Sequence, residues 1–362
     1  MSPDTAPAAR EADSIRPDGA RPAADPTRPD VPRLVGREIE DLVRAALLED
    51  LGADRDPALA GVWGPDEIEL LLARDLATAH SVPRDARAVG VLTAKGRGTL
   101  AGLEVYAAAF RALDPTAETV FEKRDGDAVL RGDLVARTAA SARALLTAER
   151  TALNLLQRAS GIATLTRRFV TAAERGGDAG IYDTRKTAPG LRVLDKHAVV
   201  MGGGHNHRFG LFDEAMLKDN HLDLSGVDAH DEAARAAFVA SVRASVGDGV
   251  RLHVEARSEE EARGALAGGA DVVLLDNFEP AELKPVVARL RAFADELGRA
   301  PERGPIEFEA SGGIDLETVS AYAGSGVDRL SIGALTHSVR ALDLSLSIEG
   351  AESTEGAEKS DA

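Results

Sequence analysis

The chain of 362 residues contains no cysteine. This absence excludes disulfide bonds, thiol nucleophiles, cysteine-bound zinc and iron–sulfur clusters, and it favours a reducing compartment. Long apolar runs are also missing: none approaches the roughly 20 residues that span a bilayer, and the N-terminus lacks the apolar core of a secretory signal. We therefore expect a cytoplasmic protein that does not associate with membranes.

Basic residues are in the minority, with 43 lysines and arginines against 60 acidic residues and a formal net charge of −17. Nonspecific binding of nucleic acid needs a broad basic surface, so we do not expect nucleic acid as a partner. Any positive charge that serves function must be concentrated in a pocket. The length of the chain suits two domains, or one large barrel with an appendage.

Both ends of the chain have compositions typical of disorder. Residues 1–33 hold seven of the 16 prolines and show no apolar periodicity, and the tail 348–362 is acidic. A transit peptide at the N-terminus is disfavoured, because such peptides contain few acidic residues and this segment contains several.

The first half of the folded region mixes helical and strand patterns. Apolar spacing predicts a helix over 38–51 and strands over 88–93 and 128–138, with the second strand broken at Gly132-Asp133 as in a hairpin or bulge. Residues 141–174 are expected to form one or two long helices that are interrupted at Gly161. This part is predicted to be an α+β unit.

After residue 180, short apolar strands alternate with amphipathic helices. A capping box at Ser258-x-x-Glu261 predicts the start of one of these helices. Such alternation predicts a parallel sheet, and its length favours a barrel over an open sheet. The predicted strands cover 181–182, 215–217, 251–254, 272–275, 306–309 and 329–332.

One segment departs from the acidic character of the chain. Residues 183–221 hold six lysines and arginines against five acidic residues, a local charge of +1. Cationic charge at turns predicts an anionic ligand. Four of the eight histidines also lie in this segment: His197, His205, His207 and His221.

Polar residues follow each predicted strand of the parallel sheet. The carboxyl ends of the strands in a parallel barrel share one face, where active sites lie, so these residues are expected to converge. Two glycine turns among them, Ser311-Gly312-Gly313 and Gly333-Ala334, let backbone N–H groups approach a phosphate, although such glycines often form plain turns. The polar segments are 183–186, 218–221, Glu255, 276–277, 311–313 and 333–334.

The side chains at these ends suggest particular ligands. Arg185 and Arg208 can each bind a carboxylate through two parallel hydrogen bonds, a geometry that lysine cannot supply. A structural ion pair with Asp183 or Asp213 is the alternative for either arginine alone. The larger cationic group favours a binding pocket: Arg185, Lys186, Arg208 and Lys218.

Glu255 and Asp276 are candidate ligands of Mg²⁺ or of ribose hydroxyls, and they can also stabilise developing positive charge. Pairing with a neighbouring lysine is the alternative. Zinc binding by His205-x-His207 is disfavoured, because no Glu-x-x-His motif or cysteine accompanies it and the preceding glycines indicate an irregular loop.

With these residues in place, the chain resembles the quinolinate phosphoribosyltransferase family, also called nicotinate-nucleotide pyrophosphorylase (carboxylating). The likeness runs in order over about 34–348 and is closest in the cationic segment. Two departures lie in the first domain: additional residues over 53–74, and Lys95-Gly96-Arg97-Gly98 where the family commonly has an acidic residue. The matching strings are ERTALN at 149–154, SGIAT at 160–164, DTRKT at 183–187, GGGHNHR at 202–208, KDNH at 218–221 and EASGGI at 309–314.

The resemblance implies an N-terminal α/β sandwich over 34–145 and an incomplete, seven-stranded, TIM-like α/β barrel over 146–347. It further implies a homodimer with shared active sites, with a higher oligomer also open. The implied reaction converts quinolinate and phosphoribosyl pyrophosphate, with Mg²⁺, to nicotinate mononucleotide, pyrophosphate and CO₂.

The resemblance also implies roles for individual residues. Lys186, Glu255 and Asp276 are the implied catalytic residues and meet phosphoribosyl pyrophosphate, with Mg²⁺ at Glu255 and Asp276. The residues implied to bind the 5′-phosphate are Ser311, Gly312, Gly313, Gly333, Ala334 and Leu335. The residues implied to bind quinolinate are Arg150 from the neighbouring subunit and Thr184, Arg185, His207, Arg208 and Lys218.

Three other functions stay open at this stage. A related phosphoribosyltransferase that acts on another acid, as in the paralogue associated with molybdenum transport, is the first, although two arginines suit the two carboxylates of quinolinate. The second is a barrel aldolase in which Lys218 forms a Schiff base. The third is an inactive barrel that senses a phosphorylated ligand.

Overall fold

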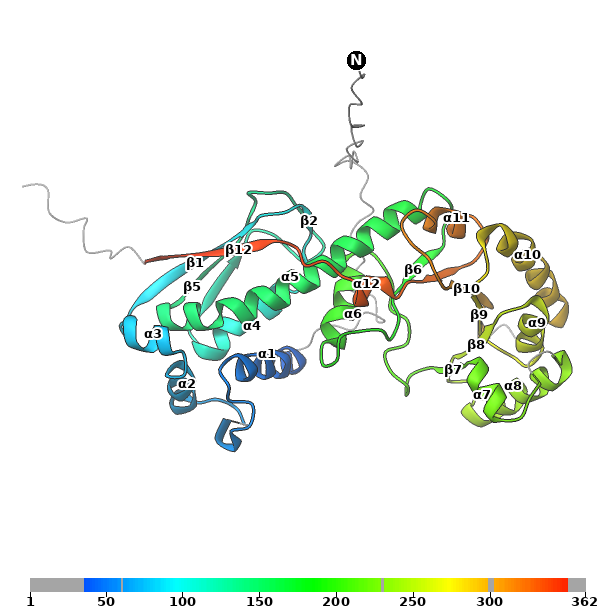
Figure 1. The fold of residues 1–362 in the computed structure, drawn as a ribbon, viewed down its shortest axis with the longest axis horizontal. Helices are drawn as coiled ribbons and strands as arrows, with labels where there is room; N and C mark the ends of the chain where they lie inside the picture. The colour runs from blue at the N-terminus through cyan, green and yellow to red at the C-terminus, as the bar shows by residue number, and fades with distance from the viewer. Residues whose placement is uncertain (1–35, 60, 229–230, 299–302, 351–362) are drawn as a thin grey trace, which may run out of the picture.

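The computed structural model describes residues 36–59, 61–228, 231–298 and 303–350, so the predicted extension 1–33 and the residues after 350 lie outside the described part. Within these ranges the chain forms two units joined by one long helix, α5 (Ala142–Ala173) (Figure 1). The predicted class, an α/β unit followed by a parallel α/β unit, is confirmed. Within the same ranges, no helix combines the length and apolar character needed to cross a membrane.

The first unit packs helices against an antiparallel sheet of order β12-β1-β5-β3. Helices α4 and α5 contact the sheet, and α1 packs on α4 and α5 from the other side (Figure 1). The helix predicted over 38–51 is confirmed as α1, which buries Ile39, Val43 and Leu47 at helical spacing. The elements are α1 (Gly36–Asp50), a 3-10 helix (Pro57–Leu59), α2 (Pro65–Leu72), α3 (Leu76–Ser81), β1 (Arg87–Ala94), β2 (Gly98–Thr99), α4 (Leu103–Leu113), β3 (Glu118–Phe121), β4 (Ala128–Val129), β5 (Leu134–Ser141) and β12 (Leu344–Gly350).

The break predicted in the strand over 128–138 exists, but the hairpin interpretation is wrong. Gly132, at φ 96°, separates β4 from β5. β4 pairs with β2, whereas β5 pairs with β1 and β3, so the two halves belong to different sheets. A bulge does occur in β5, at Val135, because the register with β1 shifts between Leu92 and Thr93.

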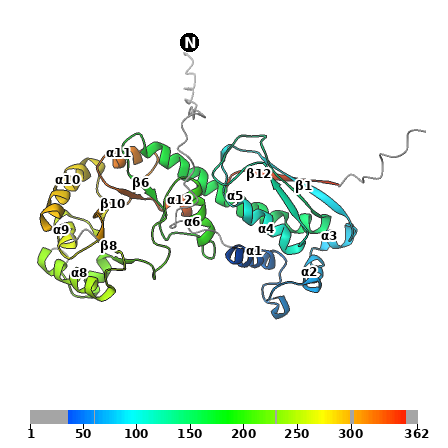
Figure 2. The same ribbon diagram turned by 180° about the vertical axis from the view of Figure 1, so that it is seen from behind.

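The second unit is a parallel sheet of order β6-β11-β10-β9-β8-β7 with helices packed on its outer face (Figure 2). It has six strands in the described residues, one fewer than the resemblance implied. A single parallel bridge between Tyr182 and His205 occupies the place beside β6 where a seventh strand would lie. The elements are β6 (Gly180–Tyr182), α6 (Arg192–Met201), β7 (Ala215–Leu217), α7 (Asp219–Leu224), α8 (Glu232–Val246), β8 (Leu252–Ala256), α9 (Glu259–Ala267), β9 (Val272–Asp276), α10 (Pro280–Leu297), β10 (Glu307–Ser311), α11 (Val319–Ala323), β11 (Arg329–Ser331) and α12 (Ala334–His337).

The end of the chain returns to the first unit. β12 pairs with β1 over Ala88 to Ala94 and forms the edge of the antiparallel sheet. Residues 348–350 therefore belong to a strand, and the acidic tail begins later than the predicted boundary at 348. The strand is difficult to predict from the sequence, because its only apolar residues are Leu344, Leu346 and Ile348 and an acidic tail follows it.

The interruption predicted at Gly161 is wrong, because α5 runs through it as one helix of 32 residues. The glycine instead permits close contact between α5 and the segment before β12. A Cβ atom placed on Gly161 would lie 2.3 Å from the carbonyl oxygen of Arg340 and 3.0 Å from Cα of Ala341. The sequence alone does not distinguish a glycine that permits close packing from one that interrupts a helix.

Gly161→Ala is therefore expected to destabilise the protein although alanine is the better helix former. The gain in helix propensity is about 1 kcal/mol, whereas displacing backbone in a packed core costs about 1–3 kcal/mol. The thermal midpoint of unfolding should fall by a few degrees. Gly36→Ala in α1 is the control, because no atom lies within 4 Å of its added Cβ. A higher midpoint for the Gly161 variant would contradict the contact.

Candidate active site

Two adjoining cavities open at the carboxyl ends of the parallel strands. The larger has a volume of about 450 Å³ and the smaller about 360 Å³. The sheet register explains their shared wall, since Asp276, Ser311 and Ser331 stand side by side on β9, β10 and β11. The residues that line both cavities are Thr184, Lys186, Asp276, Ser311 and Ser331.

The larger cavity contains two arginines without carboxylate partners. In the part of the chain that the structure describes, neither Arg185 nor Arg208 forms an ion pair, and Nε of Arg185 is buried without a hydrogen-bond partner. Among the described residues, the guanidinium of Arg208 forms only long hydrogen bonds, to the carbonyl oxygen of Glu214 and the sulfur of Met216. Burial and the charge of Arg185 lower the pKa of Arg208. The pair is a site of unneutralised positive charge, as an anionic ligand requires.

The proposed structural partners of these arginines are engaged elsewhere. Asp183 is buried and accepts hydrogen bonds from Nζ of Lys196 at 2.6 Å and from the backbone N–H of His207 at 2.8 Å. Burial raises the pKa of Asp183, against the lowering effect of Lys196. Asp213 accepts backbone N–H groups of Phe209 and Gly210. The structural ion-pair alternative for Arg185 and Arg208 is therefore wrong.

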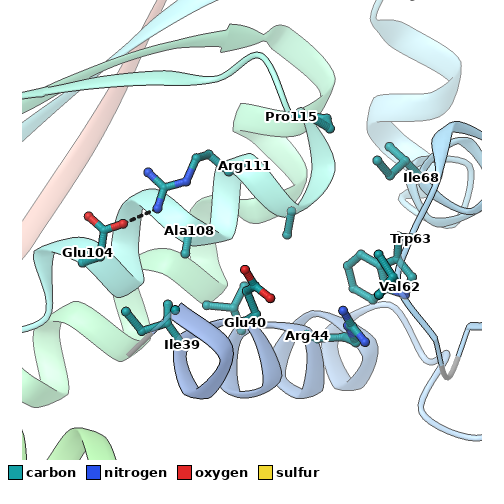
Figure 3. A pocket seen from close by; sticks show the side chains of 13 residues that line it. Ile39, Glu40, Arg44, Val62, Trp63, Ile68, Glu104, Ala108, Arg111 and Pro115 are labelled. Atoms are coloured by element: carbon teal, nitrogen blue, oxygen red, sulfur yellow. Dashed lines mark hydrogen bonds and ion pairs between the residues drawn. The ribbon is translucent and has the colours of Figure 1, made fainter. Parts of the chain in front are cut away.

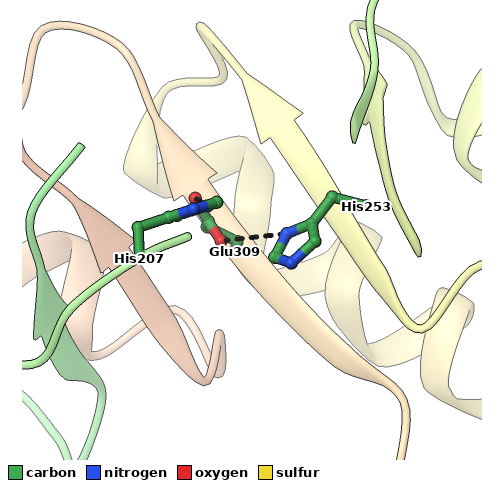
Figure 4. Close-up of side chains that lie close together, drawn as sticks. All are labelled: His207, His253 and Glu309. Atoms are coloured by element: carbon green, nitrogen blue, oxygen red, sulfur yellow. Dashed lines mark ion pairs between the residues drawn. The ribbon is translucent and has the colours of Figure 1, made fainter. Parts of the chain in front are cut away.

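Beneath the larger cavity, Glu309 lies between two histidines (Figure 4). Oε1 of Glu309 is 3.2 Å from Nε2 of His207, and Oε2 is 3.9 Å from Nδ1 of His253 and 3.3 Å from Nε of Arg329. The side chain of Glu309 is fully buried, which raises its pKa, but His207, Arg329 and His253 outweigh burial and lower the pKa to about 2. Glu309 is thus a buried anion that is held by Arg329 and by two histidines.

The hydrogen bonds of this cluster disfavour a metal ion. Three potential ligand atoms of His207, His253 and Glu309 lie within 4.8 Å of one another. However, Nδ1 of His207 accepts the backbone N–H of Arg208 at 2.8 Å, so the ring proton of the neutral histidine is on Nε2, toward Glu309. A metal would need that nitrogen without its proton. His207 also lines the larger cavity, and its implied contact with a quinolinate carboxylate stays a prediction.

The carboxylates of Glu255 and Asp276 face the larger cavity with basic partners. Nζ of Lys218 is 2.6 Å from Oε2 of Glu255, and Arg257 lies 3.8 Å from Glu255 and 4.0 Å from Asp276. Burial and the nearby charge of Glu255 raise the pKa of Asp276. Both carboxylates are therefore held close together, and a cation would relieve their repulsion. Nζ of Lys218 is engaged with Glu255, which does not suit a Schiff-base lysine.

The smaller cavity is built from the two glycine turns. Gly312 has φ 98°, and an added Cβ would lie 2.2 Å from Oδ1 of Asn277, itself at φ 61°. Lys186 crosses the second turn, because an added Cβ on Gly333 would lie 2.9 Å from its Cδ. Backbone N–H groups at such turns and a lysine suit a phosphate.

Two predicted residues lie outside both cavities. Leu335 is buried, and its backbone N–H already donates to the carbonyl oxygen of Ile332. Arg150 projects from α5 with 60% of its side chain exposed, and its ion-pair partner is its neighbour Glu149 at 3.8 Å. Within one chain, Arg150 does not reach the cavities.

Several lining or supporting residues escaped sequence reasoning. Arg257 lines the larger cavity and His337 the smaller. Glu309 lies two residues before Ser311 on β10, and His253 two residues before Glu255 on β8, so each points to the same face as the residue above it. The alternation of two along each strand is the signal that could have identified them.

A further cavity of about 430 Å³ lies in the first unit, between α1, α4 and the loop at Trp63 (Figure 3). Its charges are mixed: Arg111 pairs with Glu104, and Arg44 stacks over the ring of Trp63 at 5.5 Å. The additional residues over 53–74 provide one wall. No group of like charges converges there, unlike in the cavities of the parallel sheet.

Comparisons with known proteins agree with this geometry. The C-terminal domain of quinolinate phosphoribosyl transferase matches residues 162–347, and its N-terminal domain matches residues 75–160. A probable nicotinate-nucleotide pyrophosphorylase (carboxylating) from Bacillus subtilis is 41% identical over 273 residues, which cover 75% of this chain and 87% of that protein. The Mycobacterium leprae nicotinate-nucleotide pyrophosphorylase (carboxylating) is 40% identical over 287 residues, with 77% and 93% covered.

Solved structures show the same fold. NadC from Streptococcus pyogenes superposes with a TM-score of 0.72 and 34% identity, over 88% of this chain and 99% of that one. The nicotinate-nucleotide pyrophosphorylase of Francisella tularensis gives a TM-score of 0.70 and 29% identity, with the same coverage.

Proposed function

Because the chain belongs to the quinolinate phosphoribosyl transferase family, we propose that its two adjoining cavities bind quinolinate and phosphoribosyl pyrophosphate. The chain is a decarboxylating phosphoribosyltransferase of NAD biosynthesis. It joins the two substrates to give nicotinate mononucleotide, pyrophosphate and CO₂. The observation that carries the assignment of the cavities is the pair of arginines without carboxylate partners beside a glycine-lined phosphate cradle.

Quinolinate occupies the larger cavity in this proposal. Arg185 and Arg208 each have a guanidinium available for one of its two adjacent carboxylates. Lys218 donates one hydrogen bond to Glu255 and has two further N–H groups for the ligand. Two arginines for two carboxylates favour quinolinate over a mono-acid, and Thr184 borders both substrates.

Phosphoribosyl pyrophosphate spans the smaller cavity and the shared wall. Ser311, Gly312 and Gly313 bind the 5′-phosphate through backbone N–H groups, together with Gly333 and Ala334, while Leu335 supports that turn from the core. Lys186 lies between the cavities and neutralises phosphate charge. Both substrates are anions, so these cations also reduce their mutual repulsion.

The carboxylates of Glu255 and Asp276 stabilise the ribosyl carbon as pyrophosphate leaves and positive charge develops. They also fit Mg²⁺, because two oxygen donors stand together and the charge of one raises the pKa of the other. When bound, the ion would neutralise the pyrophosphate leaving group. Arg257 and Lys218 balance the same carboxylates in the absence of substrate.

Loss of CO₂ follows from the charge on the pyridine ring. Bond formation between the ring nitrogen and the ribosyl carbon gives a cationic ring, which accepts the electron pair left when the adjacent carboxylate departs. That carbon then takes up a proton. The half-buried Arg208 and the fully buried Glu309 line this cavity and limit water around the carboxylate, which favours its departure.

A homodimer with shared sites is part of the proposal. Arg150 is exposed on α5, and Leu211 and Phe212, which follow Arg208, are exposed by 72% and 82%. An apolar loop beside the cavity and an exposed arginine whose ion-pair partner is its neighbour Glu149 both suit a second copy of the chain. A higher oligomer is compatible with this proposal. The cytoplasmic location is a prediction from the composition of the chain.

Release of CO₂ from quinolinate tests this function. The full chain is incubated with Mg²⁺, phosphoribosyl pyrophosphate and either quinolinate or nicotinate, and CO₂ and mononucleotide are measured. We expect both products with quinolinate and neither without the sugar pyrophosphate. Turnover of nicotinate but not of quinolinate would instead indicate a relative that acts on another acid.

A further inference from the structure

Three side chains outside the described roles connect the loop of Lys186 to α12 at the edge of the smaller cavity. They are Arg158 of α5, Asp195 of α6 and Thr336 of α12. We propose that these residues, called the loop clamp below, are positioning residues that hold Lys186 for phosphoribosyl pyrophosphate. The proposal rests on the proposed function for its substrate.

The first half of the clamp is a buried carboxylate held by two parallel hydrogen bonds. Nε of Arg158 donates to Oδ1 of Asp195 at 2.9 Å, and Nη2 donates to Oδ2 at 2.8 Å. Asp195 is fully buried, and its Oδ2 also accepts the backbone N–H of Ala188 at 3.0 Å. The carboxylate therefore fixes the chain two residues after Lys186.

The second half fixes Lys186 itself. Nη2 of Arg158 donates to the carbonyl oxygen of Thr336 at 3.1 Å, and Oγ1 of Thr336 donates to the carbonyl oxygen of Lys186 at 2.8 Å. The side chain of Lys186 then passes over Gly333, where its Cδ leaves no room for a Cβ. One arginine thus links both walls of the smaller cavity.

The location of this pair distinguishes it from ordinary ion pairs of the fold. A buried charge is costly unless it is paired and fully hydrogen-bonded. Asp195 is paired with Arg158, and its remaining hydrogen bond comes from the loop at Ala188. Arg289 and Glu259 form the same two parallel bonds, at 2.9 and 2.6 Å, on the exposed surface of α10 and α9. That pair lines neither cavity of the candidate site and provides a matched control.

Steady-state kinetics of the full-length enzyme test the clamp. Thr336→Val removes the hydroxyl at nearly constant volume, Thr336→Ser retains it, and Arg158→Lys keeps the charge without the two parallel bonds. We expect Thr336→Val and Arg158→Lys to raise the KM for phosphoribosyl pyrophosphate by about 10-fold or more, with the KM for quinolinate changed by less than about 3-fold. Thr336→Ser and the control Arg289→Lys should retain wild-type values.

Unchanged KM values for Thr336→Val, or equal increases for both substrates, would overturn the clamp even if Arg158→Lys does not fold. The serine variant separates loss of the hydrogen bond from loss of packing. A wild-type enzyme without quinolinate turnover would sink the proposed function instead. Calorimetric titration with phosphoribosyl pyrophosphate then tests the clamp separately. Equal affinities of wild type and Thr336→Val for this substrate would overturn the clamp proposal.

Discussion

Arg185→Lys is expected to lower kcat/KM for quinolinate by about 10-fold or more, although it keeps the positive charge. Arg185 has no ion-pair partner in the described residues, and its buried Nε has no hydrogen-bond partner. A carboxylate that binds across Nε and a terminal nitrogen would satisfy both groups. Lysine offers a single ammonium, so one contact is lost and a buried polar position stays unfilled.

The loss should appear as weaker use of quinolinate rather than as unfolding. Thermal midpoints of wild type and variant should agree within a few degrees, because Arg185 holds no other element in place. Arg84→Lys, at a side chain that is 75% exposed in the first unit, serves as a control with wild-type kinetics. A near-native kcat/KM for Arg185→Lys would mean that the arginine is structural.

The sequence predicts the site residues at the strand ends better than those inside the strands. Lys218, Asp276 and Ser311 stand at strand ends, where a packed core does not require polar residues, so their convergence follows from the parallel topology. Glu309 and His253 lie inside β10 and β8, among buried apolar residues. The role of Glu309 follows only from the fold, because the fold brings His207 and Arg329 into contact with it.

The same limit applies to long-range contacts of the backbone. At Gly161 the sequence predicts a helix break, because it contains no sign of Arg340, nearly 180 residues away, against which the glycine packs. The sequence does not predict the return of β12 to β1 for a similar reason, since the pairing partner of β12 lies in the first unit. Arg158 gave no signal either, because its role depends on Asp195 and Thr336 in other helices.

Arg150→Ala and Arg185→Ala are each expected to lose nearly all activity, yet mixing them should restore part of it. Arg150 lies outside the cavities of its own chain, with 60% of its side chain exposed on α5. If it completes the site of the partner, a mixed dimer has one site with both arginines. Random exchange makes about half of the dimers mixed, so about a quarter of wild-type activity should return.

A mixture of Arg185→Ala with Lys218→Ala provides the control, because both residues line the same cavity of one chain. Neither site of that mixed dimer is intact, and no recovery is expected. Exchange is established by copurification of two differently tagged chains. With exchange established, absence of recovery for the Arg150 pair would mean that each chain builds its site alone. The exposed loop of Leu211 and Phe212 would then need a different explanation, since no second copy would have to cover it.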